Sequence, residues 1–173
     1  MAKELKPLNL DYAKFRIEIV PKAPSSEGKD DVSFTVTTNT GSDYGPLKKI
    51  ASGGELSRFT LAMKVCLSQK NVKPTLIFDE IDNGVGGKTA NAIGRRLLEI
   101  SKNEQIFAIT HSPQVAALAD THFKVQKGVL NNETFSTVAE IDDNDRIEEI
   151  ARMLSGNSLT EEARKMAKVL ISD

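Results

Sequence analysis

The stretch TLIFDEIDNGVGGKTANAIGRRLLEISKNEQIFAIT, residues 75–110, decides the fold expected for this chain. It begins with a short apolar run at residues 75–78 and ends with a second one at residues 106–110. Such runs are typical of buried strands in a parallel sheet. Between them, residues 89–102 repeat apolar side chains at helical spacing. Strand, helix and strand in this order predict an α/β layer with two parallel strands.

The sequence before this stretch predicts antiparallel strands and then a helix. Residues 14–20 and 32–40 alternate between apolar and polar side chains, as half-buried strands do. Residues 21–31 are rich in turn formers and predict a connection between them. Residues 52–70 open with Ser-Gly-Gly and continue with apolar residues at helical spacing. The expected fold is therefore α/β, a mixed sheet with parallel core strands flanked by helices and antiparallel strands near the N-terminus.

The sequence after this stretch predicts a short helix, two strands and two further helices. The helix is expected over residues 113–119, because proline is favoured at the first helical position. Strands are expected at residues 122–128 and 133–141. The tail, residues 144–173, has the pattern of two helices, with Thr160 as the N-cap of the second.

Composition places the chain among ordinary globular proteins and excludes several classes. Its 173 residues, 39% hydrophobic and 27% charged, fit a single domain, residues 1–173. The net charge of -1 gives no global attraction to nucleic acid or to an anionic membrane. Cys66 is the only cysteine, which excludes an intrachain disulfide and a multi-cysteine metal site. No signal-like start or membrane-length apolar run is present, so we expect a cytoplasmic protein without membrane contact.

The Gly-Gly-Lys-Thr sequence at residues 86–89 matches the end of a phosphate-binding loop. That motif also needs a glycine at position 82, where this chain has Asp82. Asp79 and Glu80 add further negative charge just upstream, which would repel phosphate. We therefore interpret Lys88 as a solvated lysine at the start of a helix.

The acidic pair at the end of the first apolar run is the stronger candidate for chemistry. In nucleotide hydrolases a strand-end aspartate such as Asp79 holds Mg²⁺ directly or through water. Glu80, the next residue, is suited to polarise an attacking water molecule. The same pair is also consistent with acids that end a strand and bind nothing.

Two further features point to a phosphate group. Ser52, Gly53 and Gly54 precede a helix, whose free N–H groups and dipole favour an anion. An ordinary N-cap, with Glu55 favoured by the dipole, would give the same pattern. His111 follows the second apolar run, at the sheet edge where ligands of such folds bind, and is suited to a phosphate oxygen or a water.

Taken in order, these motifs resemble the heads of ABC-type ATPases. Residues 52–55 resemble the signature motif, residues 75–80 resemble Walker B, and residues 81–82 resemble the start of the D-loop. His111 is similar to the switch histidine. Glu55 and the alanine before Ser52 depart from the transporter pattern and favour the SMC-like branch, which includes proteins of DNA double-strand-break repair.

The resemblance implies an ATP site shared between two heads, with Mg²⁺ as cofactor. ATP would lie between the phosphate loop of one head and the signature motif of the other, and its hydrolysis would let the heads separate. The implied roles are metal binding for Asp79, catalysis for Glu80 and His111, and nucleotide binding for Ser52, Gly53, Gly54, Glu55 and Asp82.

The resemblance also implies partners. The sequence has no complete Walker A motif, so an N-terminal Walker A lobe of the same parent protein and a second head are expected to complete the site. Residues 1–13 are expected to be the end of a coiled coil. The isolated chain is then expected to be inactive. DNA is expected to be contacted through the full-length protein, which is expected to work near the nucleoid.

Other classes of protein remain open on the sequence. The acidic pair is consistent with a self-contained metal-dependent enzyme, with a non-catalytic interaction module, or with another SMC- or ABC-type ATPase head. Local DNA contacts would fall on the Lys48–Lys49 and Arg95–Arg96 pairs, although such pairs are usually solvated surface. His122 is assigned no role.

Overall fold

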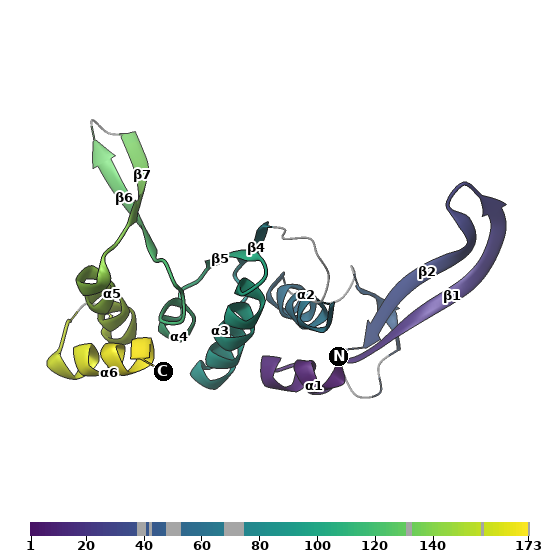
Figure 1. Cartoon of the computed structure of the whole chain (residues 1–173), viewed down its shortest axis with the longest axis horizontal. Helices are drawn as coiled ribbons and strands as arrows, with labels where there is room; N and C mark the ends of the chain where they lie inside the picture. The colour runs from purple at the N-terminus through teal and green to yellow at the C-terminus, as the bar shows by residue number, and fades with distance from the viewer. Residues whose placement is uncertain are drawn as a thin grey trace. The chain divides into compact units, whose positions relative to one another are not determined.

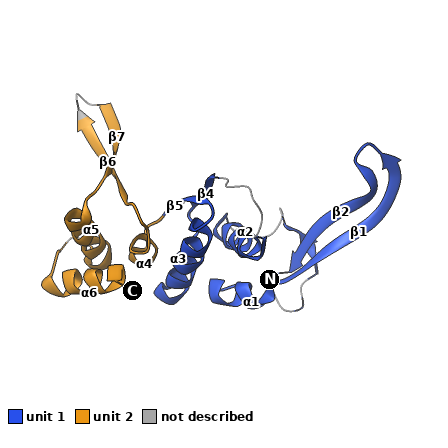
Figure 2. Cartoon of the chain, in the orientation of Figure 1, with its two compact units in different colours: residues 1–109 blue, residues 110–173 orange. Residues whose placement is uncertain are grey.

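The computed structural model describes most of the chain, and its residues form two compact units. The units are residues 1–109 and residues 110–173 (Figure 2). Each unit has its own helices and strands, and each is described by itself. The described residues are 1–37, 41, 43–47, 53–67, 75–130, 133–156 and 158–172.

A long antiparallel hairpin dominates the N-terminal part of the first unit (Figure 1). It consists of β1 (Lys14–Ser25) and β2 (Gly28–Thr37), and the short β3 (Gly45–Pro46) pairs with β2. The two alternating strands expected here are confirmed, although residues 38–40 lie outside the described part.

The connection expected over residues 21–31 is wrong, because most of it is strand. Pro21 pairs with Asp30, and Ser25 pairs with Gly28 after an irregularity in the register. The chain reverses in the short turn between the strands, where the Ser25 hydroxyl accepts a hydrogen bond from the N–H of Glu27 at 3.2 Å. Gly28 has φ +107°, which glycine adopts without strain. The cross-strand ladder therefore prevails over the turn-forming composition of this segment.

Alternate residues of the hairpin form an apolar ladder on one face. At its inner end, the Phe15 ring lies 5.3 Å from the ring of Phe59, which belongs to α2. The outer rungs, in contrast, are largely exposed to solvent. They are Ile17 with Phe34 and Ile19 with Val32.

The rest of the first unit has the predicted α/β order. It runs from α2 (Gly53–Leu67) through β4 (Thr75–Asp79) and α3 (Gly87–Ser101) to β5 (Gln105–Ile109). β4 and β5 are parallel, with Asp79 opposite Ile109. Parallel and antiparallel strands both occur, as expected, and the described strands are distributed over three small sheets.

The core of this unit lies where α2 and α3 meet one face of the parallel pair. Phe78 is the buried side chain of β4. Residues 1–13, expected to end a coiled coil, form α1 (Ala2–Leu5) and a 3-10 turn, with an ion pair of 2.5 Å between Glu4 and Arg96 of α3. The fully or almost fully buried apolar side chains include Leu5, Leu8, Leu61, Ile81, Ile93, Leu97 and Ile100.

The second unit contains α4 (Pro113–Ala116), the hairpin β6 (Phe123–Leu130) and β7 (Glu133–Glu140), and the helices α5 (Asp143–Ser155) and α6 (Glu161–Ser172). The expected order of elements is confirmed. α4 is shorter than expected, because after Ala116 the chain continues as turns of the i to i+3 type.

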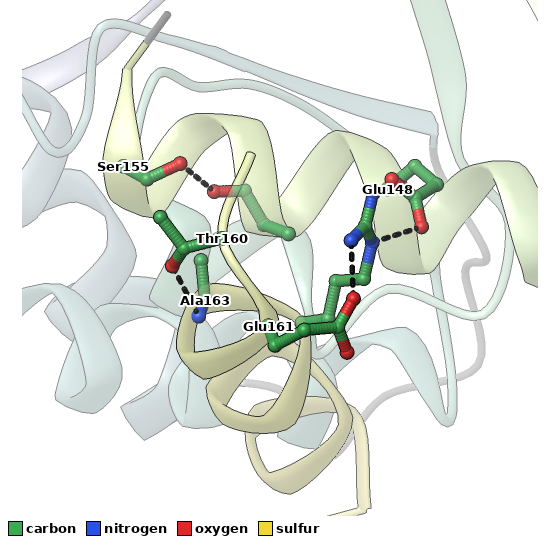
Figure 3. A network of polar contacts seen from close by, with 7 residues as sticks. Glu148, Ser155, Thr160, Glu161 and Ala163 are labelled. Atoms are coloured by element: carbon green, nitrogen blue, oxygen red, sulfur yellow. Dashed lines mark hydrogen bonds and ion pairs between the residues drawn. The ribbon is translucent and has the colours of Figure 1, made fainter. Parts of the chain in front are cut away.

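The two C-terminal helices pack through small side chains and begin with side-chain caps. Ala151, Ala163 and Ala167 are buried in this core with Ile150. The predicted N-cap of α6 is confirmed, because the N–H of Ala163 donates to the Thr160 hydroxyl at 3.1 Å. Figure 3 shows this cap beside an ionic link between the two helices. The guanidinium of Arg164 in α6 donates to Glu148 of α5 and to Glu161 in the first turn of α6.

Glu149 of α5 ties that helix to the β6–β7 hairpin. Its side chain is only 7% exposed and pairs with Lys124 of β6 at 2.6 Å. Its other partner is the guanidinium of Arg152. Hydrogen bonds from Arg152, and then from Lys124, lower the pKa of Glu149 to about 2.

The stability of the second unit is therefore expected to depend on pH. A carboxylate whose pKa is lowered on folding stabilises the fold above its unfolded pKa, and that stabilisation is lost as the pH falls toward about 2. Glu149→Gln is expected to reduce the free energy of unfolding by about 2 kcal/mol at pH 7, allowing for solvent screening of Arg152. It should have little effect near pH 2. Denaturant unfolding at both values checks this, with the exposed Glu162→Gln as control, and an equal loss at both would contradict it.

None of the described helices combines the length and apolar character needed to cross a membrane.

Candidate functional site

The acidic pair lies at the carboxyl end of the parallel strands. Asp79 is the last residue of β4, and Glu80 follows it directly. Both side chains belong to solvent-exposed residues. This edge is where open α/β sheets bind their ligands.

Glu80 opens a tight turn in a conformation that is unusual for its residue type. Its φ is +52°, in the left-handed region, where a side chain with a Cβ is strained by about 1–3 kcal/mol. The N–H of Asn83 donates to the Glu80 carbonyl at 3.0 Å and closes the turn. The Ile81 side chain is fully buried beneath it. The surrounding structure therefore holds Glu80 where it is, as is common at functional sites.

The glycine-rich start of α2 contacts this acidic turn. Gly53 is exposed and Gly54 is buried, while Ser52 lies outside the described residues. A Cβ added to Gly54 would lie 3.3 Å from the Glu80 carbonyl oxygen and 3.6 Å from that of Asn83. Two motifs that are far apart in the sequence thus meet, and a larger residue at position 54 would fit tightly against the Glu80 carbonyl. Glu55 follows in the first turn of α2 and is half-buried.

Arg58 is a residue of this site that the sequence interpretation missed. It is only 5% exposed, and its Nη1 donates to the carbonyls of Ile81 and Asn83, each at 3.5 Å. Its Nε has no hydrogen-bond partner within the described residues. Burial lowers the pKa of Arg58, and the nearby Glu55 acts in the opposite direction.

The sequence feature that could have identified Arg58 is its position on the buried face of α2. Three of the apolar residues at helical spacing within residues 52–70 are exposed, namely Leu56, Cys66 and Leu67. The buried face instead includes Arg58 and Leu61. Those two are three residues apart and therefore share a face, so an arginine in register with the buried leucine marked an unusual position.

Asp82 and Lys88 occupy different surroundings. Asp82, half-buried, lies in the turn between Glu80 and Asn83, and its carbonyl accepts a hydrogen bond from the N–H of Val85 at 3.4 Å. Lys88 is exposed in the first turn of α3, after the N-cap Gly86. The acidic turn contacts the glycine-rich start of α2.

The two histidines belong to the second unit. His111 is exposed and follows β5 after Thr110. His122 is half-buried, and its Nδ1 has no partner within the described residues. Burial, followed by the positive charge of Arg146, lowers the pKa of His122.

The donors at the acidic edge suit magnesium only together with a ligand. Within the described residues, no group of three or more histidine, cysteine or acidic side chains could hold a metal ion. Mg²⁺, however, is often bound through one or two carboxylates, water and substrate phosphates. The Asp79 carboxylate fits that requirement.

The fold resembles that of Smc head domains. The Smc head domain with coiled coil and joint from Pyrococcus yayanosii superposes with a TM-score of 0.58, at 19% identity, covering 86% of this chain and 27% of that one. The Smc head from Pyrococcus furiosus bound to the C-terminal domain of ScpA gives 0.54, at 20% identity, covering 87% and 36%. At such identities the likeness concerns the fold alone.

Sequence comparison finds similarity to proteins named for DNA repair. The DNA repair protein RecN of Rickettsia conorii is 48% identical over 169 residues, covering 98% of this chain and 31% of that protein. RecN of Haemophilus influenzae is 38% identical over 173 residues, covering 99% and 31%. The chain is homologous to RecN and spans about a third of the length of these relatives. No protein-family model matches the chain.

Proposed function

We propose that this chain is the part of an SMC-like ABC ATPase that carries the signature motif, Walker B, the D-loop and the switch histidine, and that it acts in DNA double-strand-break repair and recombination. The observation that carries the proposal is the contact between Gly54 and the Glu80 turn. It supports a physical link between the two motifs, through which the part of the head that binds the opposite nucleotide is joined to the part that carries Glu80. The relatives named for DNA repair supply the biological setting.

The proposed chemistry is hydrolysis of ATP held between two heads. Glu80 takes the proton of the attacking water, and Asp79 orients the metal. Bound Mg²⁺ would neutralise charge that develops on the phosphate oxygens. His111 contacts the γ-phosphate. Ser52, Gly53, Gly54 and Glu55 bind the nucleotide of the opposite head, and Asp82 lies at the seam between the heads.

The exposed face of the parallel pair supports the need for a second lobe. Register partners share a face, so Ile77, Phe107 and Ile109 lie together on the side away from Phe78. Their exposed fractions are 69%, 44% and 54%. Parallel sheets are normally covered on both faces. Because the relatives extend over about three times this length, we assign the cover to a Walker A lobe of the same protein.

The isolated chain tests the proposal directly. The purified 173 residues are expected to release no phosphate from ATP above background, since the sequence has no complete phosphate loop. Adding the Walker A lobe is expected to produce Mg²⁺-dependent turnover. Strong turnover by the chain alone that is lost in Lys88→Ala would instead show a self-contained phosphate site around Lys88.

The proposal extends to partners and location. ATP binding brings two such heads together, and DNA is contacted by the full-length protein, which works in the cytoplasm near the nucleoid. Within this chain, Arg96 pairs with Glu4, and Arg95 bonds the Asn91 side chain at 3.0 Å. These existing contacts argue that neither arginine is primarily a DNA contact.

A further inference from the structure

The buried guanidinium of Arg58 links α2 to the acidic turn. It reaches the carbonyls of Ile81 and Asn83, which flank Asp82, and its Nη1 would lie 3.3 Å from a Cβ added to Gly54. We propose that Arg58 is a positioning residue that fixes the turn carrying Glu80 and Asp82 in its hydrolysis-competent form. This inference rests on the proposed function, because it assigns Arg58 to the same ATP site.

An arginine at this position needs an explanation, because an apolar side chain would fill the space more favourably. A guanidinium removed from water is destabilising unless donors and charge are compensated. Here two backbone carbonyls provide long hydrogen bonds of 3.5 Å, and the negative charge of Glu55 opposes the effect of burial on Arg58, but the Nε proton lacks a partner within the described residues. The compensation is incomplete. The retained interaction is therefore better explained by what it does to the turn than by stability.

The turn depends on contacts with the residues packed against it, because its own backbone is strained. Glu80 has φ +52°, so other parts of the structure must hold it there. The buried Ile81 side chain anchors one point of the turn, but the turn continues beyond it to Asn83. Arg58 supplies the second anchor, since its two acceptors lie on either side of Asp82. Loss of this anchor is expected to let the turn open and to misplace the Glu80 carboxylate.

Hydrogen exchange of the Asn83 amide measures this anchor without any nucleotide. That amide donates to the Glu80 carbonyl at 3.0 Å and reports closure of the turn. In the 173-residue chain, Arg58→Met is expected to accelerate its exchange about tenfold or more, with Arg58→Lys intermediate. Arg96→Met is the matched control, because it removes an arginine that pairs with Glu4 and touches no turn carbonyl. Equal exchange at Asn83 in Arg58→Met and the control would overturn the proposal.

Kinetics of the full-length protein complete the test. Arg58→Met is expected to lower kcat roughly 10- to 100-fold, because a misplaced base slows chemistry. KM for ATP should change less than about twofold, and Arg58→Lys should recover part of kcat. A rise in KM at unchanged kcat would overturn the positioning role. The proposed function has a test of its own, since it is wrong if Glu80→Gln still hydrolyses ATP. The hydrogen-exchange result at Asn83 does not depend on whether Glu80→Gln is active.

Discussion

Glu80→Gln is expected to reduce ATP turnover of the full-length protein at least about 100-fold while ATP-dependent pairing of heads persists. Glutamine has nearly the shape of glutamate and is equally able to occupy the turn, but it cannot accept the proton of the attacking water. Its neutral amide leaves the glycine-rich start of α2 and its contact with the turn unchanged. Binding and hydrolysis should therefore separate in this variant.

Two measurements on the same preparation check this separation. Phosphate release gives the turnover, and size-exclusion chromatography with light scattering, with and without ATP, gives the association of heads. Glu162→Gln, an exposed glutamate of α6, is the matched control and should behave as the wild type. If Glu80→Gln hydrolysed ATP at the normal rate, the general base would be a different group.

The features that the sequence predicted well are those with a local physical cause. The β4–α3–β5 order follows from apolar runs and helical spacing, both of which act over a few residues. The position of Asp79 at the strand end follows from the same run. The cap at Thr160 depends only on a hydroxyl and an amide three residues later.

The features that could not be predicted depend on contacts between distant segments. The extension of β1 through Ser25 depends on pairing with β2, and the local turn-forming composition pointed the other way. The Arg58 contact depends on where the turn after Glu80 lies, which no spacing within α2 encodes. The contact of Gly54 with that turn was likewise not visible in either motif alone.

The exposed face of the parallel strands β4 and β5 was also not predicted, and it bears on the proposed assembly with a Walker A lobe. The continuous apolar runs predicted strands buried on both faces, yet Ile77 is 69% exposed. The runs are consistent with the sheet of a larger structure, of which this chain holds two strands. The prediction of burial thus leads to the proposal that this exposed face of β4 and β5 meets another lobe.

Ile77→Lys tests that proposal, because little effect is expected in the isolated chain and a large effect in the assembly. In the isolated chain the side chain is already exposed, so the free energy of unfolding should change by no more than about 0.5 kcal/mol. At an interface with the Walker A lobe, the substitution removes a buried apolar group and places an ammonium where water is excluded. Association of the two lobes is therefore expected to weaken at least about 100-fold.

Denaturant unfolding of the chain and calorimetric titration with the Walker A lobe measure the two effects. Val169→Lys, on the 60% exposed side chain of α6, is the matched control and should alter neither quantity. Unimpaired assembly of Ile77→Lys would mean that the outer face of β4 and β5 stays in water. The apolar side chains of Phe107 and Ile109 would then need a different partner, because a two-stranded parallel sheet with one bare apolar face is unfavourable by itself.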